Sequence, residues 1–251
     1  GVVLPKHKQD VLTVVRIANE YKVPVIPRGG GTGLAGGVVG SGIVMDMSKH
    51  MNQILEVNVE EAWVKVEPGV ILDELNAVLK PHGLQFAPDV ATSSRATIGG
   101  MVSNNSAGAH SVIYGKTIDH VLELDLILAD GTETTVGELD EPEVQKKCEQ
   151  QTLEGQAYRE VIRLARENAD EIEKRYPKIL RRVGGYNLDE FIKKQPFSLA
   201  RMIVGSEGTL ATVVAAKLQV IPLPVAKVLG IVQFEGLVES MRAVAPILET
   251  E

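Results

Sequence analysis

Glycine dominates the stretch PRGGGTGLAGG, residues 27–37, which follows the apolar run VPVI. Glycine loses more conformational entropy on folding than any other residue, so six glycines among eleven residues need a physical reason. Successive backbone N–H groups in a compact glycine turn form a nest that binds phosphate. Arg28 adds a charge-assisted donor and Thr32 adds a hydroxyl. The stretch therefore indicates phosphate binding, and the alternative is a flexible linker.

Part of this loop, GTGLAG at residues 31–36, matches the dinucleotide-binding pattern G-x-G-x-x-G. That pattern requires a helix immediately afterwards, whose N-terminus receives the pyrophosphate. Here GVVGSG and a predicted strand follow, which leaves no room for such a helix. The Walker A loop is excluded as well, because no Gly-Lys-Ser/Thr sequence closes the turn. The sequence favours a nest of backbone donors that needs no helix.

Two later segments also combine glycine with small polar residues. The first is RATIGGMVSNNSAGAHSVIYG, residues 95–115, where small side chains let the backbone approach a flat ligand while hydroxyl and amide groups form hydrogen bonds. The second is VGSEGTLATV, residues 204–213, where two glycines flank Glu207. Taken singly, the first also fits a packed helix N-terminus with a polar turn, and the second fits a turn before a strand.

Alternating strand and helix patterns must position these segments. A strand (GVVL), a helix and a strand (VPVI) open the chain, and the apolar residues Val11, Leu12, Val15 and Ala18 share one face of that helix. The glycine loop follows, then a strand (GIVMDM) and two strands within 54–69.

The remaining elements follow the same pattern. A helix is predicted over 70–83, a hairpin over 121–136 with Asp-Gly at its turn, a helix over 155–176 and a strand over 209–224. A fresh strand and helix are expected within 227–249. Since two prolines close the preceding strand, we expect a domain boundary near Pro224.

Composition narrows the classes of protein. The net charge is −7 and there is no block of lysine or arginine, which disfavours a nucleic acid partner. The single cysteine, Cys148, builds neither an intrachain disulfide nor a cysteine metal cluster and favours a reducing compartment. No apolar run approaches the length of a membrane-spanning helix. The chain begins at Gly1 and ends within a helical pattern, so we expect it to be part of a longer protein.

Together, in this order and at these separations, the three segments resemble the PCMH-type FAD-binding domain of the vanillyl-alcohol oxidase/p-cresol methylhydroxylase superfamily. The similarity is greatest to the glycolate oxidase, D-lactate and D-2-hydroxyglutarate dehydrogenases, and RRVGGYNLDEF, residues 181–191, resembles members fused to an iron–sulfur module. The resemblance implies two α+β subdomains, about 1–47 and 48–224, with FAD between them. It also implies that 225–251 begins a truncated C-terminal substrate (cap) domain.

The same resemblance implies which residues bind FAD. The pyrophosphate loop comprises Arg28, Gly29, Gly30, Gly31, Thr32, Gly33 and Leu34. The other implied cofactor residues are Asp89, Thr97, Gly99, Gly100, Ser103, Asn104, Ser106, Gly108 and Glu207. Many members of the superfamily bind flavin covalently through a histidine in or near the glycine loop, whereas this loop has none, so we expect non-covalent FAD. His110 follows the second segment, and a structural role or a hydrogen bond near the flavin both remain open.

An arginine and a threonine of related dehydrogenases bind the substrate carboxylate, and here Arg182 is the expected substrate-binding residue. Gly184 stands where the threonine is expected, so this sequence departs from the pattern. An arginine fork suits a carboxylate, and a solvated charge beside a helix is the alternative. We expect no metal site in this chain, because its five histidines are scattered.

The implied activity is that of a flavin-dependent dehydrogenase, which oxidises a D-2-hydroxy acid such as lactate, glycolate or 2-hydroxyglutarate by hydride transfer to FAD. No catalytic residue is assigned, because the base of the related enzymes sits in the C-terminal domain. Electrons would pass to an iron–sulfur module or another acceptor. We expect a cytoplasmic protein, with or without attachment to the inner membrane through partners. The alternatives are an FAD-binding electron-transfer or regulatory module, and a non-flavin phosphate- or sugar-nucleotide-binding protein.

Overall fold

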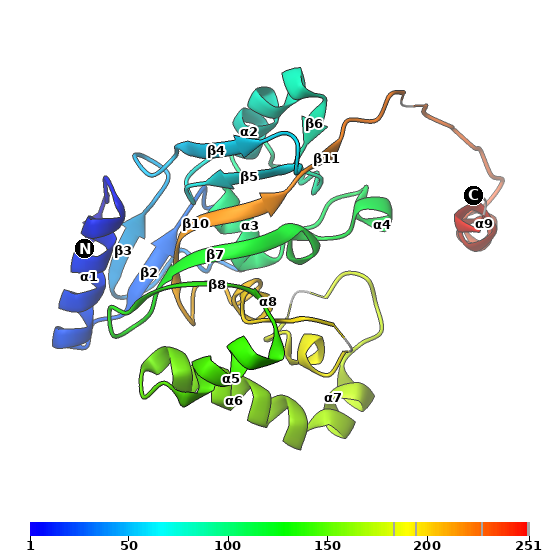
Figure 1. The fold of residues 1–251 in the computed structure, drawn as a ribbon. Helices are drawn as coiled ribbons and strands as arrows, with labels where there is room; N and C mark the ends of the chain where they lie inside the picture. Colours follow the sequence, from blue (N-terminus) through cyan, green and yellow to red (C-terminus); the bar gives the residue numbers. More distant parts are fainter. Residues whose placement is uncertain (183, 194, 227, 250–251) are drawn as a thin grey trace.

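Two main β-sheets organise the computed structural model, which describes residues 1–249 except 183, 194 and 227 (Figure 1). The smaller sheet is parallel, with the strand order β1 (Val2–Val3), β3 (Ile43–Asp46), β2 (Val25–Arg28). Helix α1 (Lys8–Tyr21) connects β1 to β2. The crossover brings the end of β2, and with it the start of the glycine loop, to one edge of this sheet.

Helix α1 buries the apolar face that its sequence predicts. Its buried residues are Val11, Leu12, Val15 and Ala18. The first three belong, with Met45 of β3, to the smaller of two hydrophobic cores. The helix ends at Lys22, whose φ of 55° is left-handed. That reversal returns the chain to the sheet at β2.

The larger sheet is antiparallel and contains strands from distant parts of the chain. Its order is β4 (Ile54–Asn58), β5 (Trp63–Val66), β10 (Thr212–Gln219), β7 (Val121–Ile127), β8 (Glu133–Leu139) and β9 (Phe197–Ser198). Because β10 lies between β5 and β7, the turn before it reaches the centre of the molecule. A short pair joins β6 (Leu84–Gln85) to β11 (Ile221–Pro222).

Helices cover the larger sheet and connect its strands. Those nearest its core are α2 (Leu72–Leu79) and α3 (Ile98–Asn104), whose apolar residues share one buried cluster with Leu124 and Leu126 of β7. The others are α4 (Ser111–Tyr114), α5 (Glu141–Glu149), α6 (Leu153–Glu167), α7 (Ala169–Arg175) and α8 (Ala200–Ile203), with the 3₁₀ turns η1 (Lys80–His82), η2 (Thr117–His120) and η3 (Leu188–Phe191). The α+β architecture expected from the sequence is confirmed.

Two of the expected elements differ in the structure. The helix predicted over 155–176 is broken at Asn168, because this side chain donates from Nδ2 to Leu164 O at 2.9 Å and α7 starts afresh. The prediction of a strand after residue 227 is wrong, since residues 228–235 pair with no strand among the described residues. Helix α9 (Leu237–Leu248) does form, and it lies apart from the rest of the molecule (Figure 1). No helix in the described part of the chain is long and apolar enough to cross a bilayer.

Candidate functional site

A cavity of about 960 Å³ lies where the glycine loop meets α3 and the turn before β10. Its volume is at the upper end of the range that small-molecule and cofactor sites occupy, roughly 300–1,000 Å³. Its wall consists of segments 27–38, 89–109 and 207–213, with Met47, Pro68 and Arg181. The three glycine-containing segments singled out in the sequence therefore meet at one site.

The glycine loop packs so closely against the start of α3 that side chains are excluded from it. A Cβ on Gly29 would lie 2.1 Å from Thr97 Oγ1, and a Cβ on Gly30 would lie 2.1 Å from the carbonyl oxygen of Arg95. Gly31 has a φ of 66°, which favours glycine for a second reason. The loop thus exposes backbone rather than side chains to the cavity, which fits a ligand with phosphate groups.

Arg28 is held beside this loop by Asp46. Its Nη1 lies 3.6 Å from Asp46 Oδ2, and its Nη2 lies 3.3 Å from where a Cβ of Gly31 would be. Asp46 Oδ1 in turn accepts hydrogen bonds from the backbone N and the Oγ of Ser48, at 2.9 and 2.6 Å. A positioned guanidinium therefore stands next to the backbone donors, as an anion site requires.

Helix α3 and the loop after it form a second wall with polar side chains. Thr97 caps the helix by accepting from Gly100 N at 3.3 Å. Asn104 Nδ2 donates to Ser106 Oγ at 3.0 Å. Ser103 lines the cavity with them. These hydroxyl and amide groups suit a ligand that carries several hydroxyls.

The turn before β10 brings a carboxyl group to the same cavity. Glu207 has a φ of 54°, which is uncommon for a residue other than glycine, and Gly205 and Gly208 beside it are also left-handed. The turn is tied to α3, because Glu207 N donates to Ser103 O at 2.9 Å. No partner of the Glu207 carboxylate occurs within the described residues, and burial raises its pKa above the ordinary value.

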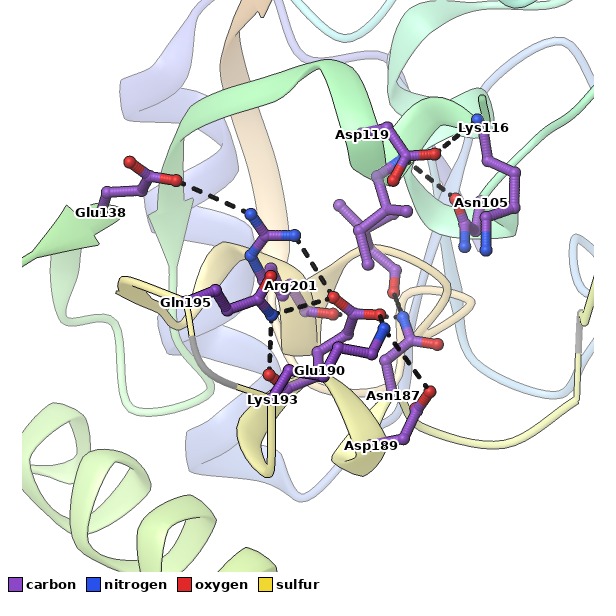
Figure 2. A network of polar contacts seen from close by, with 12 residues as sticks. Asn105, Lys116, Asp119, Glu138, Asn187, Asp189, Glu190, Lys193, Gln195 and Arg201 are labelled. Atoms are coloured by element: carbon purple, nitrogen blue, oxygen red, sulfur yellow. Dashed lines mark hydrogen bonds and ion pairs between the residues drawn. The ribbon is translucent and has the colours of Figure 1, made fainter. Parts of the chain in front are cut away.

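A polar network that includes Asn187, Glu190 and Arg201 anchors this turn to the loop after α7, which also carries Arg181 and Arg182; Figure 2 shows the first three. The buried Asn187 donates from Nδ2 to Val204 O at 2.7 Å and to Arg201 O at 3.1 Å. Burial disfavours the charged form of Glu190, but hydrogen bonds from Lys193 and Gln195 outweigh it and hold the pKa of Glu190 below its ordinary value. Arg201 Nη1 donates to the same carboxylate at 3.3 Å. The network fixes the position of this loop relative to the cavity.

Within that loop the two arginines have different surroundings. Arg182 binds Asp189 through two hydrogen bonds of 2.9 and 2.6 Å and Asn187 through a third of 3.0 Å. It faces a separate cavity of about 430 Å³. Arg181 is exposed, lines the large cavity, and has no bonded partner in the part of the chain that the structure describes.

All sixteen residues that the sequence assigned to the cofactor line the large cavity, whereas Arg182 does not. Sequence reasoning missed other lining residues. They are Pro27, Ala35, Gly37, Val38, Met47, Pro68, Val90, Ala91, Thr92, Ala96, Met101, Ala107, Ala109, Arg181, Gly208, Ala211 and Val213. Most are small or apolar, and their residue types give no indication of a functional role. Arg181 is the exception, because it adjoins Arg182 and its guanidinium is equally suited to bind a carboxylate.

A family model described as "FAD binding domain" matches residues 1–137. A D-2-hydroxyglutarate dehydrogenase of Pseudomonas putida is 42% identical over 96% of this chain and 24% of its own length. The Escherichia coli enzyme of that name is 39% identical over 96% of this chain and 24% of its own length. Glycolate oxidase subunit GlcD of Bacillus subtilis is 29% identical over 99% of this chain and 42% of its own length. The chain thus spans less than half the length of these relatives.

The fold also has a counterpart among solved structures. A structure of alkyldihydroxyacetonephosphate synthase superposes on 90% of this chain and 32% of its own chain, with a TM-score of 0.60 and 23% sequence identity. At this identity the likeness concerns the fold alone.

Proposed function

Because the chain belongs to the FAD binding domain family, we propose that it forms the FAD-binding part of a flavin-dependent dehydrogenase that oxidises a D-2-hydroxy acid. The relatives named D-2-hydroxyglutarate dehydrogenase and glycolate oxidase subunit support this class of substrate. Lactate, glycolate and 2-hydroxyglutarate are the candidates. When bound, FAD supplies the acceptor for a hydride, and the protein supplies binding and orientation.

The observation that carries this proposal is the cavity in which all the implied cofactor residues meet. Its glycine loop exposes backbone donors beside Arg28, which suits the two phosphates of FAD. Ser103, Asn104 and Ser106 suit the hydroxyls of the ribityl chain. We propose non-covalent binding, since the glycine loop carries no histidine.

For the substrate carboxylate we propose Arg181 in preference to Arg182. Its location on the cavity wall and its unpaired state among the described residues support this role. The guanidinium of Arg182 already holds Asp189 and Asn187, which supports a positioning role instead. A substrate role of Arg182 therefore requires these bonds to break.

We also propose that the segment from residue 225 onward begins the cap domain that completes the substrate site. Its apolar side chains are exposed, with Val228 at 94% and Leu229 at 84% of their full accessibility, which suits residues that a further domain covers. The electron acceptor would be an iron–sulfur module or another carrier outside this chain. A cytoplasmic location, with or without partner-mediated attachment to the inner membrane, belongs to the same proposal.

The test is an absorbance spectrum of the purified protein after incubation with FAD and removal of free ligand. We expect a flavin band at about 450 nm that stays with the protein, and we expect denaturation to release it into solution. Flavin that remains on the denatured chain would contradict non-covalent binding. A protein that retains no flavin at all would contradict the proposal and favour the phosphate- or sugar-nucleotide-binding alternative.

A further inference from the structure

His110 follows Ala109, which lines the cavity, and is paired with Asp89, one of the lining carboxylates. Asp89 Oδ1 accepts a hydrogen bond from His110 N at 3.1 Å, and Asp89 Oδ2 is bonded to the ring Nδ1 of His110. The carboxylate therefore fixes the orientation of the imidazole. The ring Nε2 has no partner in the part of the chain that the structure describes, and the side chain is about half exposed.

The backbone is shaped to allow this pairing. A Cβ on Gly108 would lie 2.1 Å from Asp89 Oδ1 and 2.3 Å from the carbonyl oxygen of Asp89. Glycine at this position lets the loop after α3 close onto Asp89, and Ala109 then leads directly to His110. Since His110 engages both oxygens of Asp89, the group of this pair left to meet a ligand is His110 Nε2.

Helix α3 separates this pair from the glycine loop. The loop contacts the residues at the start of α3, while Gly108, which packs against Asp89, follows the helix in the chain. Seven residues at 1.5 Å per residue place about 10 Å between the two ends. Ser103 and Asn104, in the last turn of α3, and Ser106 line the same cavity. A phosphate site at the start of α3, hydroxyl-binding groups at its end and the pair attached through Gly108 suit the pyrophosphate, ribityl chain and flavin ring of FAD.

On this basis, and resting on the proposed FAD site, we propose that His110 hydrogen-bonds the redox-active ring of FAD through Nε2, with Asp89 as its positioning residue. Hydride transfer adds two electrons and one proton to the ring and leaves one negative charge on it. When the imidazole carries both protons, Nδ1 donates to Asp89 and Nε2 donates to that charge. The pair stabilises reduced flavin more than oxidised flavin.

The test is the midpoint potential of the FAD-bound protein, measured at saturating FAD by equilibration with reference dyes. We expect His110→Gln to shift the potential to more negative values by at least a tenfold change in the equilibrium, about 30 mV for a two-electron couple. Asp89→Asn should shift it in the same direction, because Nδ1 loses its carboxylate. His82→Gln, an exposed histidine with no bond to a residue that lines the cavity within the described chain, is the matched control and should leave it unchanged.

A second readout does not depend on the redox equilibrium. The ¹⁵N resonance of His110 Nε2 should move when FAD binds, whereas those of His82 should not. A potential in His110→Gln equal to that of the unmutated protein, together with an unmoved Nε2 resonance, would overturn the inference. Absence of flavin from the unmutated protein would instead contradict the proposed function, so the two failures are distinguishable.

Discussion

At Gly30 the wall of the cavity leaves no space for a side chain, since a Cβ would lie 2.1 Å from a backbone carbonyl oxygen. A Gly30→Val substitution must displace the loop from α3 and with it the backbone donors. We expect the Kd for FAD to rise at least tenfold, which corresponds to about 1.4 kcal/mol. Titration of the protein with FAD, followed by flavin fluorescence, measures this.

Gly230→Val is the matched control, because a Cβ on Gly230 meets no atom within 4 Å. Circular dichroism of both variants separates loss of binding from loss of fold. FAD affinity that stays unchanged in a folded Gly30→Val variant would count against the backbone nest.

Glu207 makes the stability of the protein without FAD depend on pH. Burial raises its folded pKa above the ordinary value of 4.5. As the pH rises through that range the unfolded chain loses its proton first, so the free energy of unfolding falls. Glu207→Gln should therefore increase Tm relative to the unmutated protein, with a difference that grows as the pH rises above 4.5.

Thermal unfolding at a series of pH values tests this expectation. Glu60→Gln, in the exposed β4–β5 turn, is the control and should show no such trend. A Glu207→Gln difference that is constant with pH would show that the carboxyl is not held in its neutral form.

At the scale of elements, Asn187 joins the Arg182 loop to the turn that carries Glu207. Asn187→Ala removes its hydrogen bonds to Val204, Arg201 and Arg182 and leaves buried carbonyl groups unpaired. We expect a loss of roughly 2 kcal/mol in the free energy of unfolding, together with weaker FAD binding. Urea unfolding measures the first, and FAD titration measures the second.

The exposed Asn52 supplies a comparison, since its side chain accepts one 3.4 Å hydrogen bond from Gln53. Asn52→Ala should change neither quantity. If Asn187→Ala behaved like Asn52→Ala, the network would not position the turn.

Sequence reasoning succeeded where a local pattern decides the element. The spacing of apolar residues predicts helix α1. The Asp130-Gly131 pair predicts the hairpin turn, where Gly131 has a φ of 83°. Sequence reasoning failed where the bonding of a single side chain, or the presence of a partner strand far away in the sequence, decides which element forms. Asn168 ends α6 by bonding the backbone oxygen of Leu164, and 228–235 has the composition of a strand but no strand beside it among the described residues. The sequence also could not show that Arg182 is bonded to Asp189 and Asn187 while Arg181 lines the large cavity, so the substrate-binding role of Arg182 stays a prediction.

At the scale of the whole molecule, the chain carries a cofactor cavity but spans about a quarter of its dehydrogenase relatives. We therefore expect the purified chain to bind FAD without oxidising D-lactate or D-2-hydroxyglutarate at a useful rate. A dye-reduction assay on the FAD-bound protein measures this. Turnover comparable to that of a complete hydroxy-acid dehydrogenase, assayed alongside as the control, would show that the chain holds the entire substrate site.

Strand β10 touches both halves of the molecule with consecutive residues. Val214 belongs to the small core with α1 and Met45, whereas Val213 lines the cavity and belongs to the large core. These two residues lie at a register shift of β10 against β7, and there one strand contributes to both packing surfaces. Neither sheet can melt without exposing apolar surface of the other. We therefore expect the two sheets to unfold as one cooperative unit, and we expect a ligand in the cavity to protect the backbone amides of both from hydrogen exchange.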